Sequence, residues 1–282
     1  MRSLCFRGSD ILYVHQPERF FPRSRALTPG SLEHAGSRSG DYLTRFGCRK
    51  SDRTMAALSR FNELANTYEE WFATRLGSLV ARREKELIVG LLRPTAGETM
   101  LEVGSGTGYL MREIARSGAR CVGVEPSAAM LAVAVSRSGR TIDYVRGRSE
   151  SLPFREASFH GLLYMTTLEF MQDVDASLRE GVRVVRPDGR LVFGVPNAKG
   201  PWARARRREG GLWNEARFFG ASELEAMLSA YGAVQVESCV HVPPQLGWLP
   251  VPVLSVIDLL MRRLSPGSGA LVGARVTPRR LQ

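Results

Sequence analysis

The segment that most constrains the fold is Met100–Gly108, where an apolar run enters three alternating glycines. It reads Met-Leu-Glu-Val-Gly-Ser-Gly-Thr-Gly. Glycines at this spacing let the backbone turn sharply and approach a ligand without interference from a Cβ atom. We expect a side chain at Gly104 to block that ligand while leaving the fold largely intact. The pattern predicts a strand, a ligand-binding loop and then a helix.

The spacing of these glycines differs from the dinucleotide pattern G-x-G-x-x-G. Tyr109 occupies the position of the last glycine, and Gly108 comes one residue early. Glu125 stands at the end of the next expected strand, where a carboxylate can accept hydrogen bonds from both hydroxyls of a ribose. Together the two features favour a nucleoside ligand other than a dinucleotide.

Strand-like and helix-like segments alternate after this loop, which is typical of a doubly wound sheet. We expect strands at 99–103, 120–124, 142–146, 161–164, 190–195, 234–240 and 270–276, and helices near 109–117, 128–136, 176–185 and 222–231. The predicted fold is α/β, a Rossmann-like doubly wound sheet that is mostly parallel, with an antiparallel last strand and helices on both faces. Ligands of such sheets bind at the carboxyl ends of the strands.

The residues before the sheet divide into two parts. Residues 1–54 lack periodicity and mix arginine with glycine, serine and proline, so we expect a disordered or dispensable extension. Residues 55–282 would form the domain, which begins with a helical cap over 55–98. An apolar stripe from Phe61 to Phe72 has the spacing of one amphipathic helix.

The net charge of +11 raises the question of a nucleic-acid or acidic membrane partner. Lysine occurs only at Lys50, Lys85 and Lys199, so the charge is almost all arginine, which suggests a bias of the whole chain more than one binding patch. We therefore do not expect a nucleic-acid partner. The four cysteines are scattered without metal-ligand spacing. We expect a cytoplasmic protein without a metal.

Taken together, the motifs resemble the class I S-adenosylmethionine-dependent methyltransferases, specifically the type 11 small-molecule branch that includes quinone-biosynthesis enzymes. The resemblance covers about Phe61 to Tyr231. Its motifs are Leu101–Gly108, Val124–Ser127 with Met130-Leu131, Ser151–Phe154, Thr166–Leu168 and Val184–Leu191. It implies an enzyme that transfers a methyl group from S-adenosyl-L-methionine to the oxygen, nitrogen or carbon of a small molecule.

The resemblance also implies which residues bind the cofactor. Those around its methionine and ribose parts are Tyr68, Glu102, Gly104, Ser105, Gly106, Gly108 and Glu125. Those around its adenine and sulfonium are Pro126, Met130, Ser149, Glu150, Thr166 and Thr167. In this scheme Glu125 takes the ribose, and Tyr68 closes the site with its hydroxyl near the cofactor carboxylate.

Two positions depart from the family pattern. Arg148 stands where many members place an aspartate that accepts from the adenine amine, and a guanidinium cannot accept a hydrogen bond. His160 stands at the usual aspartate before the fourth strand, and we interpret it as a surface substitution rather than a catalytic base.

A general base is not obligatory for methyl transfer, because positioning alone can supply much of the acceleration. Glu169 and Asp173 are the acids that we nominate as a base, although capping or solvated roles are favoured for both. No Asn-Pro-Pro-Tyr type tetrapeptide of the amino-methylating nucleic-acid branch is found. A nucleic-acid methyltransferase and an inactive cofactor-binding protein remain the alternatives.

Two insertions are expected to determine what else the protein contacts. Residues 197–220 would form a lid for an anionic or aromatic acceptor, or else a solvated arginine helix with buried tryptophans. The residues expected at the acceptor are Trp71, Trp202, Trp213 and Arg217. Residues 246–268 contain an amphipathic helix whose polar stripe includes Asp258. We expect its apolar face to pack in the core of a monomer or in the interface of a homodimer. Peripheral contact with a membrane is the alternative.

Overall fold

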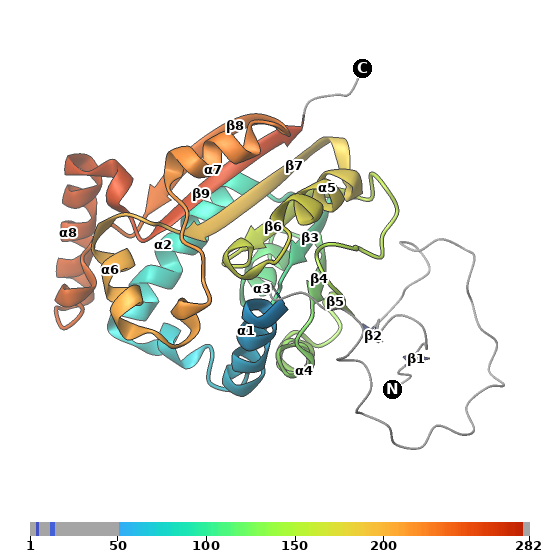
Figure 1. The fold of residues 1–282 in the computed structure, drawn as a ribbon, viewed down its shortest axis with the longest axis horizontal. Helices are drawn as coiled ribbons and strands as arrows, with labels where there is room; N and C mark the ends of the chain where they lie inside the picture. The colour runs from blue at the N-terminus through green and yellow to red at the C-terminus, as the bar shows by residue number, and fades with distance from the viewer. Residues whose placement is uncertain (1–3, 6–11, 15–50, 279–282) are drawn as a thin grey trace.

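The computed structural model describes residues 4–5, 12–14 and 51–278, so most of the predicted extension lies outside the described residues. Seven strands after the cap form a sheet with the order β5-β4-β3-β6-β7-β9-β8 (Figure 1). Their bounds are β3 Thr99–Val103, β4 Arg120–Glu125, β5 Ile142–Arg146, β6 Phe159–Met165, β7 Val185–Pro196, β8 Gly232–Cys239 and β9 Leu271–Pro278. Strands β5, β4, β3, β6 and β7 are parallel, and β9 is antiparallel to both β7 and β8. The predicted fold class is confirmed.

Two short strands continue the sheet beyond β5. They are β1 Leu4–Cys5 and β2 Leu12–Val14, and β2 pairs antiparallel with β5. Both belong to the segment that the sequence predicts to be an extension. Whether that segment is dispensable remains a prediction.

Helices cover both faces of the sheet (Figure 1). One face carries α2 Arg75–Leu92, α3 Tyr109–Ala115 and α4 Ala128–Ser138, and the other carries α5 Val174–Val184 and α7 Ala221–Leu228. Successive strand residues point to opposite faces. Met100 therefore packs in the core under α2 and α3, whereas its neighbour Leu101 packs in the core under α5 and α7. This alternation explains why the central strands are apolar throughout.

The cap differs from the single helix that the apolar stripe predicts. Helix α1 spans Ser51–Leu64, turns follow, and a short 3₁₀ helix η2 spans Glu70–Ala73. Helix α1 thus begins ahead of the predicted boundary at residue 55. The Thr54 hydroxyl donates to the carbonyl of Phe170 at 3.2 Å, which ties this first turn to the segment after β6.

The two insertions contain the remaining helices. Between β7 and β8, α6 spans Gly200–Glu209 and the 3₁₀ helix η4 spans Gly211–Asn214. After β8, α8 spans Val251–Leu264 between two 3₁₀ turns, η5 Pro244–Leu246 and η6 Pro266–Ser268. Within the described ranges, no helix combines the length and apolarity needed to cross a membrane.

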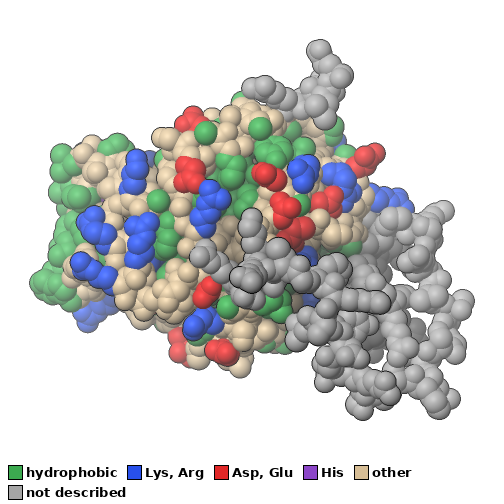
Figure 2. All heavy atoms as spheres, viewed as in Figure 1, with side chains coloured by type: hydrophobic (Ala, Val, Ile, Leu, Met, Phe, Trp, Pro, Cys, Tyr) green, Lys and Arg blue, Asp and Glu red, His purple; other side chains and the backbone are tan. Residues whose placement is uncertain are grey.

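Helix α8 has the predicted bounds, but its polar stripe faces the protein. Asp258 is 5% exposed, pairs with Arg83 of α2 at 3.1 Å and accepts hydrogen bonds from the backbone N–H groups of His241 and Val242. The exposed apolar side chains of α8 are Val253, Val256, Leu259, Leu260 and Leu264. Figure 2 shows hydrophobic side chains gathered at the left edge, where α8 lies in Figure 1, with basic side chains nearby.

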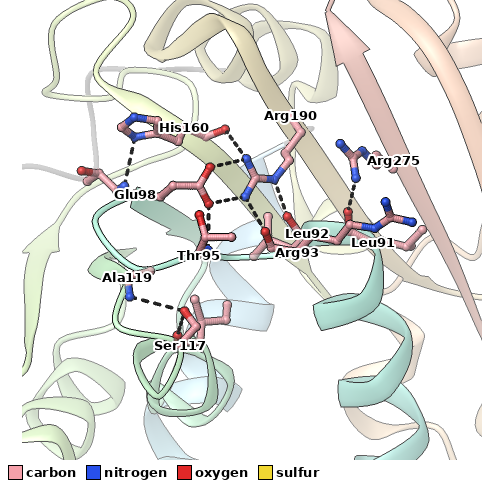
Figure 3. Close-up of polar contacts among 12 residues, drawn as sticks. Leu91, Leu92, Arg93, Thr95, Glu98, Ser117, Ala119, His160, Arg190 and Arg275 are labelled. Atoms are coloured by element: carbon pink, nitrogen blue, oxygen red, sulfur yellow. Dashed lines mark hydrogen bonds and ion pairs between the residues drawn. The ribbon is translucent and has the colours of Figure 1, made fainter.

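At the amino ends of the strands, Arg190 joins β7 to the segment between α2 and β3 (Figure 3). Its guanidinium pairs with Glu98 at 2.6 Å and donates to the carbonyls of Leu92 and Arg93. Hydrogen bonds from Arg190 lower the pKa of Glu98 to about 2. His160 also lies here, and its Nδ1 accepts the backbone N–H of Thr99 at 3.0 Å. His160 therefore has a structural contact far from the carboxyl ends of the strands.

Candidate functional site

A cavity of about 920 Å³ lies at the carboxyl ends of β3, β4 and β6, bordered by α1, α2 and α6. Every predicted cofactor residue except Gly108 lines it. Of the predicted acceptor residues, Trp71, Trp202 and Trp213 line it, and Arg217 does not. The position of the cavity is the one at which doubly wound sheets bind their ligands.

The loop between β3 and α3 has a backbone that requires glycine. Gly104, Gly106 and Gly108 have φ angles of 73°, 52° and 72°, in the left-handed region that other residues rarely adopt. A Cβ on Gly104 would lie 2.3 Å from the Thr167 side chain, and one on Gly108 would lie 2.0 Å from the Tyr144 hydroxyl. A Cβ on Gly106 would meet no atom within 4 Å. The expectation that a side chain at Gly104 leaves the fold intact is therefore corrected, because the protein itself fills that space.

Glu125 ends β4 and holds the loop in place. Its Oε2 accepts the N–H of Gly106 at 2.9 Å, and its Oε1 accepts the N–H of Ser127 at 2.8 Å. Burial raises the pKa of Glu125 to about 7, although these two N–H groups lower it. A carboxylate has about four acceptor sites, so each oxygen can still accept a hydrogen bond from a ligand.

Glu102 is the last residue but one of β3 and is 3% exposed. Its Oε2 has no hydrogen-bond partner among the residues that the structure describes. Burial and the nearby Glu125 raise its pKa well above the usual range, whereas Arg112 lowers it. A buried carboxyl group without a partner is costly unless a ligand supplies one.

The segment after β6 closes one side of the cavity. Thr166 has φ 46°, which is rare for a β-branched residue and indicates a strained backbone of the kind found at functional sites. Its side chain lies near the hydroxyl of Tyr68, and burial raises the pKa of that hydroxyl to about 12. Tyr68 lies in the turns between α1 and η2 and not on a helix. It reaches the cavity from the cap, as expected.

The expected adenine end contains both polar and apolar residues. Met130 is 1% exposed, and Ser149 accepts a hydrogen bond from Ser177 at 2.7 Å. Arg148 lines the cavity and pairs with Glu150 at 3.5 Å. Glu150 thus supplies a carboxylate beside the position where the family pattern has an aspartate.

Glu69 attaches the cap to the glycine loop, and nothing in the sequence singled it out. It accepts hydrogen bonds from the Thr107 hydroxyl and from Arg112 of α3, and it pairs with Arg137 of α4 at 2.7 Å. Although burial alone would raise its pKa, these contacts lower it. Its position directly after Tyr68 is the feature of the sequence that could have indicated it, whereas its pairing with arginines of two helices is visible only in the structure.

The insertion between β7 and β8 borders the cavity with Trp202 and Trp213. Trp202 is 6% exposed, and its indole N–H donates to the carbonyl of Val242 at 2.8 Å. Arg217 turns away from the cavity, since it pairs with Glu223 at 2.6 Å and lies over the ring of Phe219. The segment therefore combines a cavity wall with a buried tryptophan.

The two nominated acids have different environments. Asp173 caps α5 by accepting the N–H of Ala176 at 2.8 Å, outside the cavity. Glu169 lies in the 3₁₀ helix η3 Leu168–Phe170, lines the cavity and is 2% exposed. Nothing in the sequence predicts that Glu169 lines the cavity and Asp173 does not.

The cavity is acidic although the chain is basic. Its lining includes the glutamates Glu63, Glu84, Glu102, Glu125, Glu150, Glu169 and Glu209. The basic residues in the lining are Arg60, Lys85, Arg148 and Arg206. Burial raises the pKa of Glu102 and Glu125 among them, so a bound cation would be matched by carboxyl groups that ionise against it.

A family model described as a methyltransferase domain matches residues 101–193. A demethylmenaquinone methyltransferase from Tropheryma whipplei is 34% identical over 133 residues, which are 47% of this chain and 55% of that protein. The chain thus spans about half the length of this relative. An uncharacterized protein from Mycobacterium tuberculosis is 32% identical over 205 residues, 69% of this chain and 68% of that protein.

Among solved structures, a SAM-dependent methyltransferase from Thermotoga maritima has a TM-score of 0.63 and 24% identity. The likeness covers 78% of this chain and 99% of that one. At this identity the comparison establishes the fold.

Proposed function

The chain belongs to the type 11 branch of the S-adenosylmethionine-dependent methyltransferases, and we propose that its cavity binds S-adenosyl-L-methionine and that the protein methylates a small-molecule acceptor. A small-molecule acceptor is supported by the name of the Tropheryma relative, a demethylmenaquinone methyltransferase. The acidic lining supports a cofactor that carries an ammonium and a sulfonium.

The observation that carries this proposal is the Glu125 carboxylate, held by the N–H groups of Gly106 and Ser127 at the end of β4. In this position it would accept the ribose hydroxyls. The unpartnered Oε2 of Glu102 would receive the ammonium, which would remove the cost of leaving that buried carboxyl alone. The open space at the missing Cβ of Gly106 leaves room for the ligand to approach the backbone.

The bound cofactor supplies a methyl group on a sulfonium, an electrophile that needs no further activation. The protein's part is to orient the reactants and exclude water. Tyr68 and Thr166 would do this from the cap and the end of β6, because both side chains line the cavity. Glu69 would keep the cap closed through Arg112 and Arg137.

The test is calorimetric titration with S-adenosylhomocysteine, the demethylated product. Glu125→Ala is expected to lose tenfold or more in affinity, since hydrogen bonds to charged groups contribute about 1.5–3 kcal/mol each. Glu125→Gln keeps one acceptor oxygen and should lose less. The matched control is Glu225→Ala, on the exposed side of α7. Unchanged affinity in Glu125→Ala would remove the ribose assignment.

Two further outcomes would favour the alternatives. A salt-sensitive gel shift with nucleic acid would indicate a nucleic-acid methyltransferase. Cofactor binding without turnover over a wide panel of acceptors would indicate an inactive binding protein.

A further inference from the structure

One group of charged side chains in the cavity is not used by the expected cofactor contacts. It consists of Glu84 of α2, Glu169 of η3 and Arg206 of α6. Burial raises the pKa of each carboxyl, and Arg206 lowers both. The two carboxylates in turn counter the burial that lowers the pKa of Arg206. The three side chains therefore line one cavity and interact electrostatically, although they come from distant parts of the chain.

Glu169 lacks a partner that a buried carboxyl group needs. It is 2% exposed, and neither carboxyl oxygen has a hydrogen-bond partner among the described residues. Its backbone is fixed, since its carbonyl accepts the N–H of Arg217 at 2.9 Å. Buried carboxylates are normally paired or hydrogen-bonded, so the missing partner is one that a ligand can supply.

Arg206 does not fill this role. Its Nη1 donates to the carbonyl of Ala270 at 2.9 Å, and its guanidinium lies over the ring of Trp213 at 4.7 Å. In the described part of the chain it forms no ion pair within 4 Å with either glutamate. When a bound cation ionises both carboxyl groups, the two carboxylates and one guanidinium carry one negative charge, which a single monovalent cation would neutralise.

We propose that the acceptor is a small amine, which binds as its ammonium between Glu84 and Glu169 and gives its proton to Glu169. This inference rests on the proposed function. Trp71, Phe72 and Trp213 line the same cavity, so the amine is carried on an apolar frame, and aromatic faces attract the cation as well.

The transfer step balances as follows. The ammonium loses one proton to the Glu169 carboxylate, and the freed lone pair on nitrogen forms the bond to the methyl carbon. The bond from that carbon to sulfur breaks and leaves its electron pair on sulfur. The products are a methylated ammonium, S-adenosylhomocysteine and a protonated Glu169, with the same total charge as before.

The experiment is calorimetric titration of protein saturated with S-adenosylhomocysteine, which first shows whether the cofactor site is intact. The probes are 2-phenylethylamine, tryptamine and n-hexylamine, each compared with the alcohol that replaces its amine. We expect at least one amine to bind tenfold or more tightly than its alcohol. Burial raises the pKa of Glu169 to about 8, so binding the ammonium at pH 7 should release protons in titrations with two buffers of different ionisation enthalpy.

Glu84→Gln and Glu169→Gln should each weaken amine binding tenfold or more, about 1.4 kcal/mol, while leaving the affinity for S-adenosylhomocysteine unchanged. Glu169→Gln should also abolish most of the proton release. Glu225→Gln, the same change on the exposed side of α7, should alter neither. The proposal is overturned if no amine binds at 20 mM, if the alcohols bind equally well, or if Glu169→Gln binds the amine normally. If the unmodified protein does not bind S-adenosylhomocysteine, the proposed function itself is refuted.

Discussion

A methyl group at Gly106 tests whether the open space beside the glycine loop is reserved for a ligand. Gly106 has φ 52°, and an added Cβ would meet no protein atom within 4 Å. A non-glycine residue in the left-handed region costs about 1–2 kcal/mol. We therefore expect Gly106→Ala to lower the free energy of unfolding by that amount and no more. It should also weaken cofactor binding, because Gly106 lines the cavity and the added methyl group would occupy space that the ligand needs.

Two other glycines distinguish the cost of backbone strain from the cost of filling the ligand's space. Gly97 has φ 85°, lies outside the cavity lining and also has no atom within 4 Å of an added Cβ. Gly97→Ala should cost about 1–2 kcal/mol of stability without affecting binding. At Gly104 the added Cβ would lie 2.3 Å from Thr167, so overpacking adds about 1–3 kcal/mol to the strain.

The assays are urea unfolding and calorimetric titration with S-adenosylhomocysteine. Gly106→Ala should match Gly97→Ala in stability but lose tenfold or more in affinity, which is about 1.4 kcal/mol. Gly104→Ala should be clearly less stable than both. If Gly106→Ala binds S-adenosylhomocysteine as tightly as the unmodified chain, the ligand does not approach this backbone, and the reasoning fails.

Three further changes test the fold around the site. Arg190→Ala should cost about 3 kcal/mol at pH 7, because it leaves buried partners unpaired. Arg190 holds the pKa of Glu98 at about 2, below its ordinary value of 4.5, so this loss should shrink as urea unfolding is repeated from pH 5 down to pH 3. A chain that begins at Met55 should bind cofactor normally and melt only slightly lower, because it loses only the Thr54 hydrogen bond and the short pairing of β2 with β5. A drop of many degrees would make the preceding residues structural. The exposed apolar face of α8 lies beside arginines, so we expect flotation with anionic vesicles at low salt and its loss in Leu260→Asp, whereas no flotation of the unmodified chain would leave that face to a second copy.

The sheet could be predicted because its signals are local. The strands are short apolar runs bounded by glycine, proline or charged residues, and β5 has the predicted bounds Ile142–Arg146. The predicted bounds were wrong where a residue type is compatible with both a helix and a strand. Val185 was expected to end a helix, but it begins β7, where its β-branched side chain packs in the core under α5.

The cap was harder, because the spacing of its apolar residues fits both a helix and a folded turn. The stripe from Phe61 to Phe72 is interrupted after Leu64, and the aromatic side chains pack on other elements instead. Phe61 lies 5.1 Å from Phe170, and Phe72 stacks on Tyr109 of α3 at 4.5 Å. These contacts join residues far apart in the sequence, so periodicity cannot predict them.

The candidate site divides in the same way. Glu102 and Glu125 are visible in the sequence because each lies at the carboxyl end of a strand, Glu125 as the last residue of β4 and Glu102 as the last but one of β3. Glu84 is one of several charged residues in the middle of α2 and has no such marker. It becomes a site candidate only because it lines the same cavity as Glu169 and Arg206. Residues at the carboxyl end of a strand beside the glycine loop can be predicted from the sequence, whereas residues around the expected acceptor come together only through packing.

Helix α8 shows why amphipathicity does not by itself determine orientation. Its sequence separates an apolar face from a polar stripe, and the usual inference is that the apolar face is buried. Here Asp258 receives two backbone N–H groups at the end of β8 and the guanidinium of Arg83. Turning Asp258 outward would leave those buried N–H groups without an acceptor, at a cost of about 1–3 kcal/mol for each. Only Leu254 and Ile257 of the apolar side chains pack against the core, so the inward polar stripe fixes the helix and leaves most of its apolar face on the surface.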